Sequence, residues 1–162
     1  MMWILRAGQE ALFYEKFITD CRVYLPWNGY QLDLSRFNSR DEFRSVVINE
    51  KMSKNRTSIS NWFGQLFSFV KEIGIGDYIL IPAKRSHSYT LAVITGPYEY
   101  YENATDGLYH SRSIKIICTG IPRSIFSQTI IYSLGAFRTL FKVKYEKEVM
   151  HSITSWKKTL IS

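Results

Sequence analysis

The sequence predicts an α+β domain in which a small, partly open β-barrel of about five or six short strands is flanked by helices. Two observations favour this class. Apolar runs of strand length dominate the second half of the chain, whereas the first half contains stretches with the spacing of amphipathic helices. The chain has 162 residues, of which 46% are hydrophobic, so one domain can bury a substantial core.

The N-terminal half alternates between strand and helix patterns. Residues 2–7 (MWILRA) predict a short strand, and residues 9–20 have helical spacing. Residues 21–27 predict a second strand, which ends at a proline. Ser39 and Glu42 form a capping box that predicts the start of a helix, because each side chain can accept a hydrogen bond from a free N–H of the first turn.

The remaining elements are mostly strands. A helix from about residue 59 ends at Gly74, and residues 76–84 and 88–96 then predict a hairpin. Residues 111–121 predict a third strand of this group. A short helix is expected within 122–134 and a last strand or helix end within 137–144. We expect residues 1–144 to form the domain, and residues 145–162 to form a helical tail or linker towards a domain absent from this chain.

Charge and cysteine content indicate a cytoplasmic protein with a polyanionic partner. The formal net charge is +7 and the isoelectric point is about 9.4, which favours nucleic acid as a partner. Cys21 and Cys118 each fall in an apolar run, where buried free thiols are expected. The apolar runs are too short to suggest a membrane span. The pattern contains no Cys/His cluster, so neither a metal nor a cofactor is expected.

The chain is predicted not to be an enzyme. Its carboxylates are scattered, and none is followed two residues later by the lysine that metal-dependent nucleases place beside them. Zinc-protease, nucleophile-elbow and P-loop motifs are absent from the sequence. A small hydrolase that uses His110 together with Cys118 is a weaker alternative, since a core thiol is the commoner state of such a cysteine.

Aromatic side chains are concentrated in two connections of the predicted fold. One is the turn after the second strand, and the other is the long crossing after the hairpin. Rings on loops suit a flipped-out base, which stacks between them, or a methylammonium group, which binds their faces. Alternatively, they cover the open end of the barrel. The rings are those of Trp27, Tyr30, Tyr98, Tyr100, Tyr101 and Tyr109.

Basic residues frame these connections. At loop tips such residues typically hold phosphates and position a strand without reading its sequence, although some of them would equally suit a solvated surface. The predicted contacts to the nucleic-acid backbone are Lys84, Arg85, Arg112, Lys115 and Arg123.

Several short motifs in a particular order resemble a known family. The run GDYILIPAKRSHSYTLAVITGPYEYY, followed by HSRSIKI and GIPRSIFS, is similar to the PUA-like module, related to EVE and YTH domains, at the N-terminus of Mrr-type restriction endonucleases. The specific part is Gly76-Asp77 before an apolar strand, then the ITGPYEY strand end, His-x-Arg-x-Ile and Ile-Pro-Arg. The opening MWILRAG and the LPW…DLS segment fit as well, and the resemblance covers residues 1–144.

The resemblance implies a β-barrel wrapped by helices that receives a modified base in an aromatic cage. Related modules bind a methylated or hydroxymethylated base in DNA, or methyladenosine in RNA. Trp27 and the tyrosines at positions 98–101 occupy cage-like positions, and a hydrogen bond from a neighbouring polar side chain would read the base edge. The predicted base-binding residues are Trp27, Tyr30, Asp33, Ser35, Tyr98, Tyr100, Tyr101 and His110.

The predicted function is therefore recognition of a modified base, in double-stranded DNA, as the specificity part of a restriction or phage-defence system. The nuclease domain of such systems is missing from this chain, so we expect a fused or partner nuclease. Two alternatives stay open: an RNA-binding module of the same fold, and a reader of methyl-lysine peptides.

Overall fold

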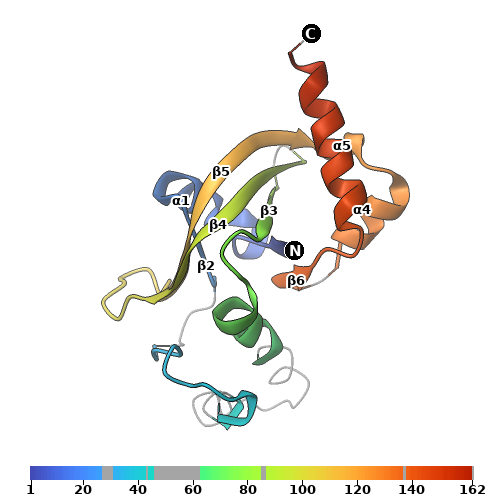
Figure 1. Ribbon diagram of the computed structural model, residues 1–162. Helices are drawn as coiled ribbons and strands as arrows, with labels where there is room; N and C mark the ends of the chain where they lie inside the picture. Colours follow the sequence, from blue (N-terminus) through green and yellow to red (C-terminus); the bar gives the residue numbers. More distant parts are fainter. Residues whose placement is uncertain (27–30, 43, 46–62, 85–86, 137, 162) are drawn as a thin grey trace.

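The fold is built on one six-stranded mixed sheet with helices on both sides (Figure 1). The computed structural model describes residues 1–26, 31–42, 44–45, 63–84, 87–136 and 138–161. The strand order is β2-β5-β4-β3-β1-β6, in which β1 pairs with β3 in parallel and every other pair is antiparallel. The strands are β1 (Met2–Leu5), β2 (Arg22–Tyr24), β3 (Tyr78–Ala83), β4 (Ser88–Tyr100), β5 (His110–Pro122) and β6 (Leu140–Lys142).

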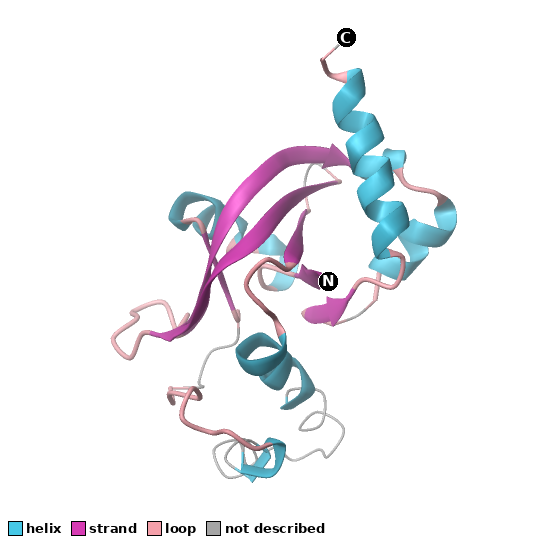
Figure 2. Ribbon diagram, in the orientation of Figure 1, coloured by secondary structure: helices cyan, strands magenta, loops and turns pink. Residues whose placement is uncertain are grey.

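The α+β class and the expected number of strands are confirmed, but the sheet is not closed into a barrel. Closure requires the two edge strands to pair. Here the edges are β2 and β6, each of three residues, and they stand at opposite ends of the strand order. The long hairpin of β4 and β5 bends across the sheet, and register shifts between the two strands accompany this curvature (Figure 2).

The helical elements differ from the predicted ones mainly near the N-terminus. The expected helix over 9–20 is instead a 3-10 turn, η1 (Gln9–Ala11), followed by α1 (Tyr14–Asp20). Glu10 and Ala11 have φ of +57°, in the left-handed region that interrupts a helix. The other helical elements with complete bounds are the π-helical turn η2 (Ser68–Glu72), η3 (Arg123–Ile125), α4 (Gln128–Leu134) and α5 (Glu146–Thr159).

The predicted capping box forms with one change of partner. Ser39 Oγ accepts a hydrogen bond of 3.1 Å from the Glu42 N–H, as expected. The Glu42 carboxylate accepts from the N–H of Asn38 at 3.3 Å, one residue before the expected partner. The helix that the box begins is described at 40–42 and 44–45, and the described part of the next predicted helix is helical over 63–72.

Both faces of the sheet are buried at β1, β3 and the first half of β4, which explains why these strands read as continuous apolar runs. In β1, Trp3 belongs to one core cluster and Ile4 to the other, because successive side chains point to opposite faces. The first cluster includes Phe17 of α1 together with Leu66 and Phe69 of the 63–72 helix. The second cluster is covered by residues of α4 and α5.

The C-terminal segment is helical, as predicted, and it packs against the second cluster. Val149 and Ile153 of α5 are 0% and 1% exposed. The helix α5 therefore contributes apolar side chains to the core of the sheet domain. The predicted role of residues 145–162 as a link towards a further domain stays a prediction.

The prediction of two buried thiols is wrong for Cys21, which is exposed, while Cys118 is half-buried. Cys21 ends α1 with φ of +51°, and β2 begins only at the next residue, so its side chain does not enter the sheet. Within the described part of the chain, no helix combines the length and apolar character needed to cross a membrane. The described residues also contain no cluster of metal-ligating side chains.

Asp77 connects three segments of the fold through one carboxylate. Its Oδ2 accepts hydrogen bonds from the Trp3 indole at 3.1 Å and from the Gly74 N–H at 2.9 Å, and its Oδ1 accepts from the α-amino group of Met1 at 3.2 Å. Burial acts to raise the pKa of Asp77, but these donors outweigh it and lower the pKa below the ordinary value of 3.8.

We expect Asp77→Asn to lower stability at neutral pH and to lose this effect in acid. Because the folded-state pKa is depressed, the carboxylate stabilises the fold above an unfolded-state pKa of about 3.9, and this contribution disappears as the pH falls through the folded-state value. Urea unfolding from pH 7 to pH 3 checks this, with the exposed Asp41→Asn as the control. A difference between wild type and Asp77→Asn that stays constant over this range would contradict the assignment.

Candidate functional site

Four rings meet where β4 ends and β5 begins. Tyr98 and Tyr100 are two residues apart on β4 and so point to the same face of the sheet. Tyr109 and His110 come from the opposite side of the connection, and Tyr100 pairs directly with His110 in the ladder. The His110 ring lies 5.8 Å from the ring of Tyr98, 5.6 Å from that of Tyr100 and 6.5 Å from that of Tyr109, measured between centroids. We refer to these four residues as the aromatic cluster.

A hydrogen-bond relay holds two members of the cluster in fixed positions. The Leu34 N–H donates to the Tyr98 hydroxyl at 3.3 Å, and the same hydroxyl lies 2.6 Å from Nδ1 of His110. Burial raises the pKa of Tyr98, which keeps its proton on the oxygen. The hydroxyl therefore links the main chain at Leu34 to the His110 ring.

The cluster has an inner and an outer pair of rings. His110 is only 1% exposed, and Tyr98 packs on the first core cluster with its ring edge-on to Phe69 at 6.4 Å. Tyr100 and Tyr109 are half-buried and lie 6.3 Å apart between centroids. The outer rings are therefore the ones that a ligand can reach, and the inner pair supports them.

The predicted polar residues Asp33 and Ser35 lie beside the cluster, since the residue between them is the one that donates to Tyr98. Asp33 Oδ1 accepts from the Ser35 N–H at 3.0 Å and from its hydroxyl at 2.7 Å. Burial opposes ionisation of Asp33, but the two bonds from Ser35 prevail and lower its pKa. The segment thus presents a negative charge close to the rings.

Tyr101 is separate from the cluster. Its hydroxyl donates to Glu99 at 2.7 Å, and the Arg22 guanidinium lies 5.4 Å from its ring centroid. Tyr100 and Tyr101 both line a hollow of about 610 Å³ between Tyr24 and the loop of residues 101–108. The hollow continues the outer side of the cluster towards α1.

Trp27 and Tyr30 lie outside the described residues, but the described chain on each side of them contacts the cluster region. The Leu25 N–H donates to the main-chain oxygen of His110 at 3.1 Å. The Gln31 side chain donates to the main-chain oxygen of Glu102 at 3.2 Å. The two connections that the sequence predicted to converge are therefore joined at their described ends.

The predicted phosphate contacts do not gather around the cluster. Arg112 is 3% exposed, and its guanidinium donates to the main-chain oxygens of Phe69, Ile73 and Gly96, so it belongs to the framework of the fold. Lys84 is exposed and forms an ion pair of 2.8 Å with Glu10. Lys115 and Arg123 are also exposed, and Arg85 lies outside the described residues.

Lys84 and Arg123 lie at the far end of the long hairpin from the aromatic cluster. Ser88 pairs with Pro122 at that end, whereas Tyr100 pairs with His110 at the other. Strands of this length extend over roughly 40 Å. Lys84 and Arg123 would therefore contact a different part of an extended ligand from the part that the aromatic cluster contacts.

The sequence prediction named Tyr109 among the loop rings but not among the base-binding residues, and it gave Arg6 no role. Tyr109 completes the outer ring pair, and its place beside His110 in a tyrosine-rich connection was an available signal. Arg6 has no local signal, because its guanidinium bonds to oxygens of residues 128 to 132 positions away.

The fold and site define an α+β domain on an open mixed sheet, with an aromatic cluster where its two longest strands meet. Residues 2–140 match the family described as Domain of unknown function (DUF8426), and the chain belongs to this family. The comparison with curated proteins gave no match. The resemblance to PUA-like modules stays a prediction.

Proposed function

We propose that this chain is a DNA-binding module that recognises a modified base, methylated or hydroxymethylated, flipped out of the duplex. The observation that carries the proposal is the aromatic cluster, in which two accessible rings stand on a hydrogen-bonded inner pair. In this role the chain binds and does not catalyse. From the resemblance, we further propose that it works in the cytoplasm as the specificity part of a restriction or phage-defence system, with a fused or partner nuclease.

The proposed mechanism assigns a distinct task to each part of the cluster. Tyr100 and Tyr109 stack on the extruded base, and each stacked base contributes about 1–3 kcal/mol. His110 within the cluster and the Asp33 carboxylate beside it are the polar groups that would read the base edge. A methyl group adds only about 0.8 kcal/mol by burial, so discrimination requires a close fit around it.

We expect Tyr100→Ala to weaken binding of a modified duplex by about 5-fold to 150-fold, because the loss of one stacking ring costs about 1–3 kcal/mol. Fluorescence anisotropy with a labelled duplex measures the change. Tyr132→Ala is the matched control, since Tyr132 is 87% exposed on α4 and lies outside the cluster. Equal losses for the two variants would remove the cluster from the binding site.

The same assay with a panel of duplexes tests the ligand class. The duplexes share one sequence and carry an unmodified, methylated, hydroxymethylated or glucosylated base. Equal affinity across the panel would reduce the proposal to general nucleic-acid binding. Tighter binding of single-stranded RNA than of every duplex would favour the RNA-binding alternative.

One observation favours a second candidate, a reader of methyl-lysine. Burial raises the pKa of Tyr100, and the charges of Glu102 and Asp33 raise it further, which indicates a negative potential at the outer rings. Such a potential, combined with ring faces, attracts a methylammonium group. Titration with trimethyl-lysine and unmodified lysine peptides separates the candidates, because only this reader would bind the methylated peptide more tightly.

A further inference from the structure

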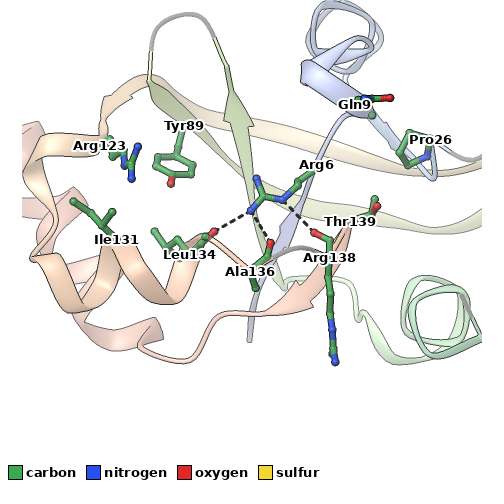
Figure 3. A pocket seen from close by; sticks show the side chains of 12 residues that line it. Arg6, Gln9, Pro26, Tyr89, Arg123, Ile131, Leu134, Ala136, Arg138 and Thr139 are labelled. Carbon is green, nitrogen blue, oxygen red and sulfur yellow. Dashed lines mark hydrogen bonds between the residues drawn. The ribbon is translucent and has the colours of Figure 1, made fainter. Parts of the chain in front are cut away.

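A second hollow lies near the opposite end of the long hairpin, and its side-chain charges are all positive. It has a volume of about 680 Å³ and opens between the end of β1, the start of β4 and the chain around the C-terminal end of α4 (Figure 3). Arg6, Tyr89 and Arg123 provide its polar side chains on the side nearest α4. Among the described residues that line it, none is acidic. We refer to it as the arginine hollow.

Arg6 is held rigidly at the edge of this hollow. Its Nη2 donates to the main-chain oxygens of Leu134 and Ala136 at 3.1 and 3.0 Å, and its Nε donates to that of Arg138 at 3.1 Å. The guanidinium thereby satisfies oxygens at the end of α4, where a cation is favourable. These bonds occupy two of its three nitrogens, and Figure 3 shows Nη1 turned away from the oxygens towards the space beside Tyr89.

Tyr89 and Arg123 complete the set of donors. Tyr89 is 9% exposed and packs edge-on against Phe126, with ring centroids 5.9 Å apart. Figure 3 places Tyr89 between the guanidinium groups of Arg123 and Arg6. Burial raises the pKa of Tyr89, against the opposing effect of the two arginine charges, so its hydroxyl is a neutral donor. Arg123 is exposed, and its side chain makes no ion pair with any described residue.

We propose that the arginine hollow is a phosphate-binding site in which Arg6, Tyr89 and Arg123 donate to the phosphate oxygens. Guanidinium groups bind phosphate through paired, charge-assisted hydrogen bonds, and Arg6 is already fixed before the ligand arrives. No carboxylate among the described lining residues competes for these donors. The phosphate comes either from a free phosphate compound or from a nucleic-acid backbone. The second source rests on the proposed function, whereas phosphate binding itself does not.

The test uses the full chain, with inorganic phosphate as one probe and an unmodified duplex without terminal phosphates as the other. Arg123→Ala removes one donor group, and Tyr89→Phe removes the hydroxyl while it keeps the packing on Phe126. Arg138→Ala is the matched control, because it removes the same charge from the rim but its side chain points away from the hollow (Figure 3). Thermal unfolding establishes that each variant is folded.

At low salt we expect Arg123→Ala to weaken phosphate binding about tenfold, Tyr89→Phe to weaken it about threefold, and Arg138→Ala to leave it within about twofold. Calorimetry measures phosphate affinity, and anisotropy measures duplex affinity. A matching loss of duplex affinity identifies the backbone as the source, and a loss for inorganic phosphate alone identifies a free phosphate compound. The proposal is overturned if Arg123→Ala and Tyr89→Phe bind both probes as wild type does, or if Arg138→Ala weakens binding equally. Tyr100→Ala separates this proposal from the proposed function. Its affinity for inorganic phosphate should not change, since inorganic phosphate has no ring to stack on the aromatic cluster.

Discussion

Replacing Arg112 with alanine is expected to lower the free energy of unfolding by about 3–5 kcal/mol. The guanidinium is buried and donates to Gly96 at 2.9 Å, to Phe69 at 3.1 Å and to Ile73 at 2.8 Å. Two of these oxygens belong to the end of the 63–72 helix and the residue after it, and the third belongs to β4. Alanine would leave three buried acceptors without this donor, and each such loss costs about 1–3 kcal/mol.

Urea unfolding of Arg112→Ala beside Lys115→Ala measures this effect. Lys115 is exposed on the same strand, so its replacement should change the unfolding free energy by no more than about 0.5 kcal/mol. Arg112→Lys should recover only part of the loss, because an ammonium group cannot reproduce the guanidinium fork. If Arg112→Ala were as stable as the control, Arg112 would not be a structural residue and its predicted phosphate contact would regain support.

The Arg112 bonds also connect stability with the candidate site. Arg112 pairs with Tyr98 in the ladder, and Phe69, one of its partners, packs edge-on against the Tyr98 ring. Loss of the guanidinium should therefore loosen the support of the inner ring pair. An Arg112→Lys variant that is folded but less stable is expected to bind ligand less tightly at the aromatic cluster, although residue 112 itself contacts no ligand there.

The second large effect is expected at the C-terminal helix, where Ile153→Ala should cost about 2–5 kcal/mol. Ile153 is 1% exposed and belongs to the core cluster that includes Met2 and Ile4 of β1. Truncation of its side chain leaves a cavity against the central sheet, so the whole domain and not only the helix should lose stability.

Thermal and urea unfolding of Ile153→Ala should show one cooperative transition at lower temperature and lower urea concentration. Ser155→Ala, at an exposed position of the same helix, is the control and should shift neither midpoint appreciably. An unchanged main transition in Ile153→Ala would mean that residues 145–162 are a separable linker. The experiment thus tests directly how far the tail belongs to the domain, since the family match ends at residue 140.

Local patterns were sufficient for most of the secondary structure. The two apolar runs at residues 76–84 and 88–96, which flank a short polar turn, predict a hairpin, and β3 and β4 confirm it. Ser39 caps its helix because the acceptor and the N–H lie within one turn of chain. The dense tyrosines around His110 likewise become neighbours through a single short connection between paired strands.

Features that depend on distant contacts were not predictable in this way. The left-handed backbone at Glu10 and Ala11 breaks the expected helix, while the Phe13 N–H donates to Ala7, outside any helical pattern. Cys21 is exposed because α1 ends there, and Arg112 resembles a surface cation in the sequence although its charge serves three internal oxygens.

The sequence by itself determined the α+β class, the hairpin, the C-terminal helix and the pairing of tyrosines around His110, since each depends on side-chain spacing along a short piece of chain. The tertiary structure decided that the sheet stays open, that Arg112 is buried and that Arg6 faces a hollow. It also decided that the exposed cations Lys84 and Arg123 and the aromatic cluster lie at opposite ends of the β4–β5 hairpin. The physical reason is that hydrogen-bond partners of a long side chain are chosen by proximity in space, which one-dimensional spacing does not encode.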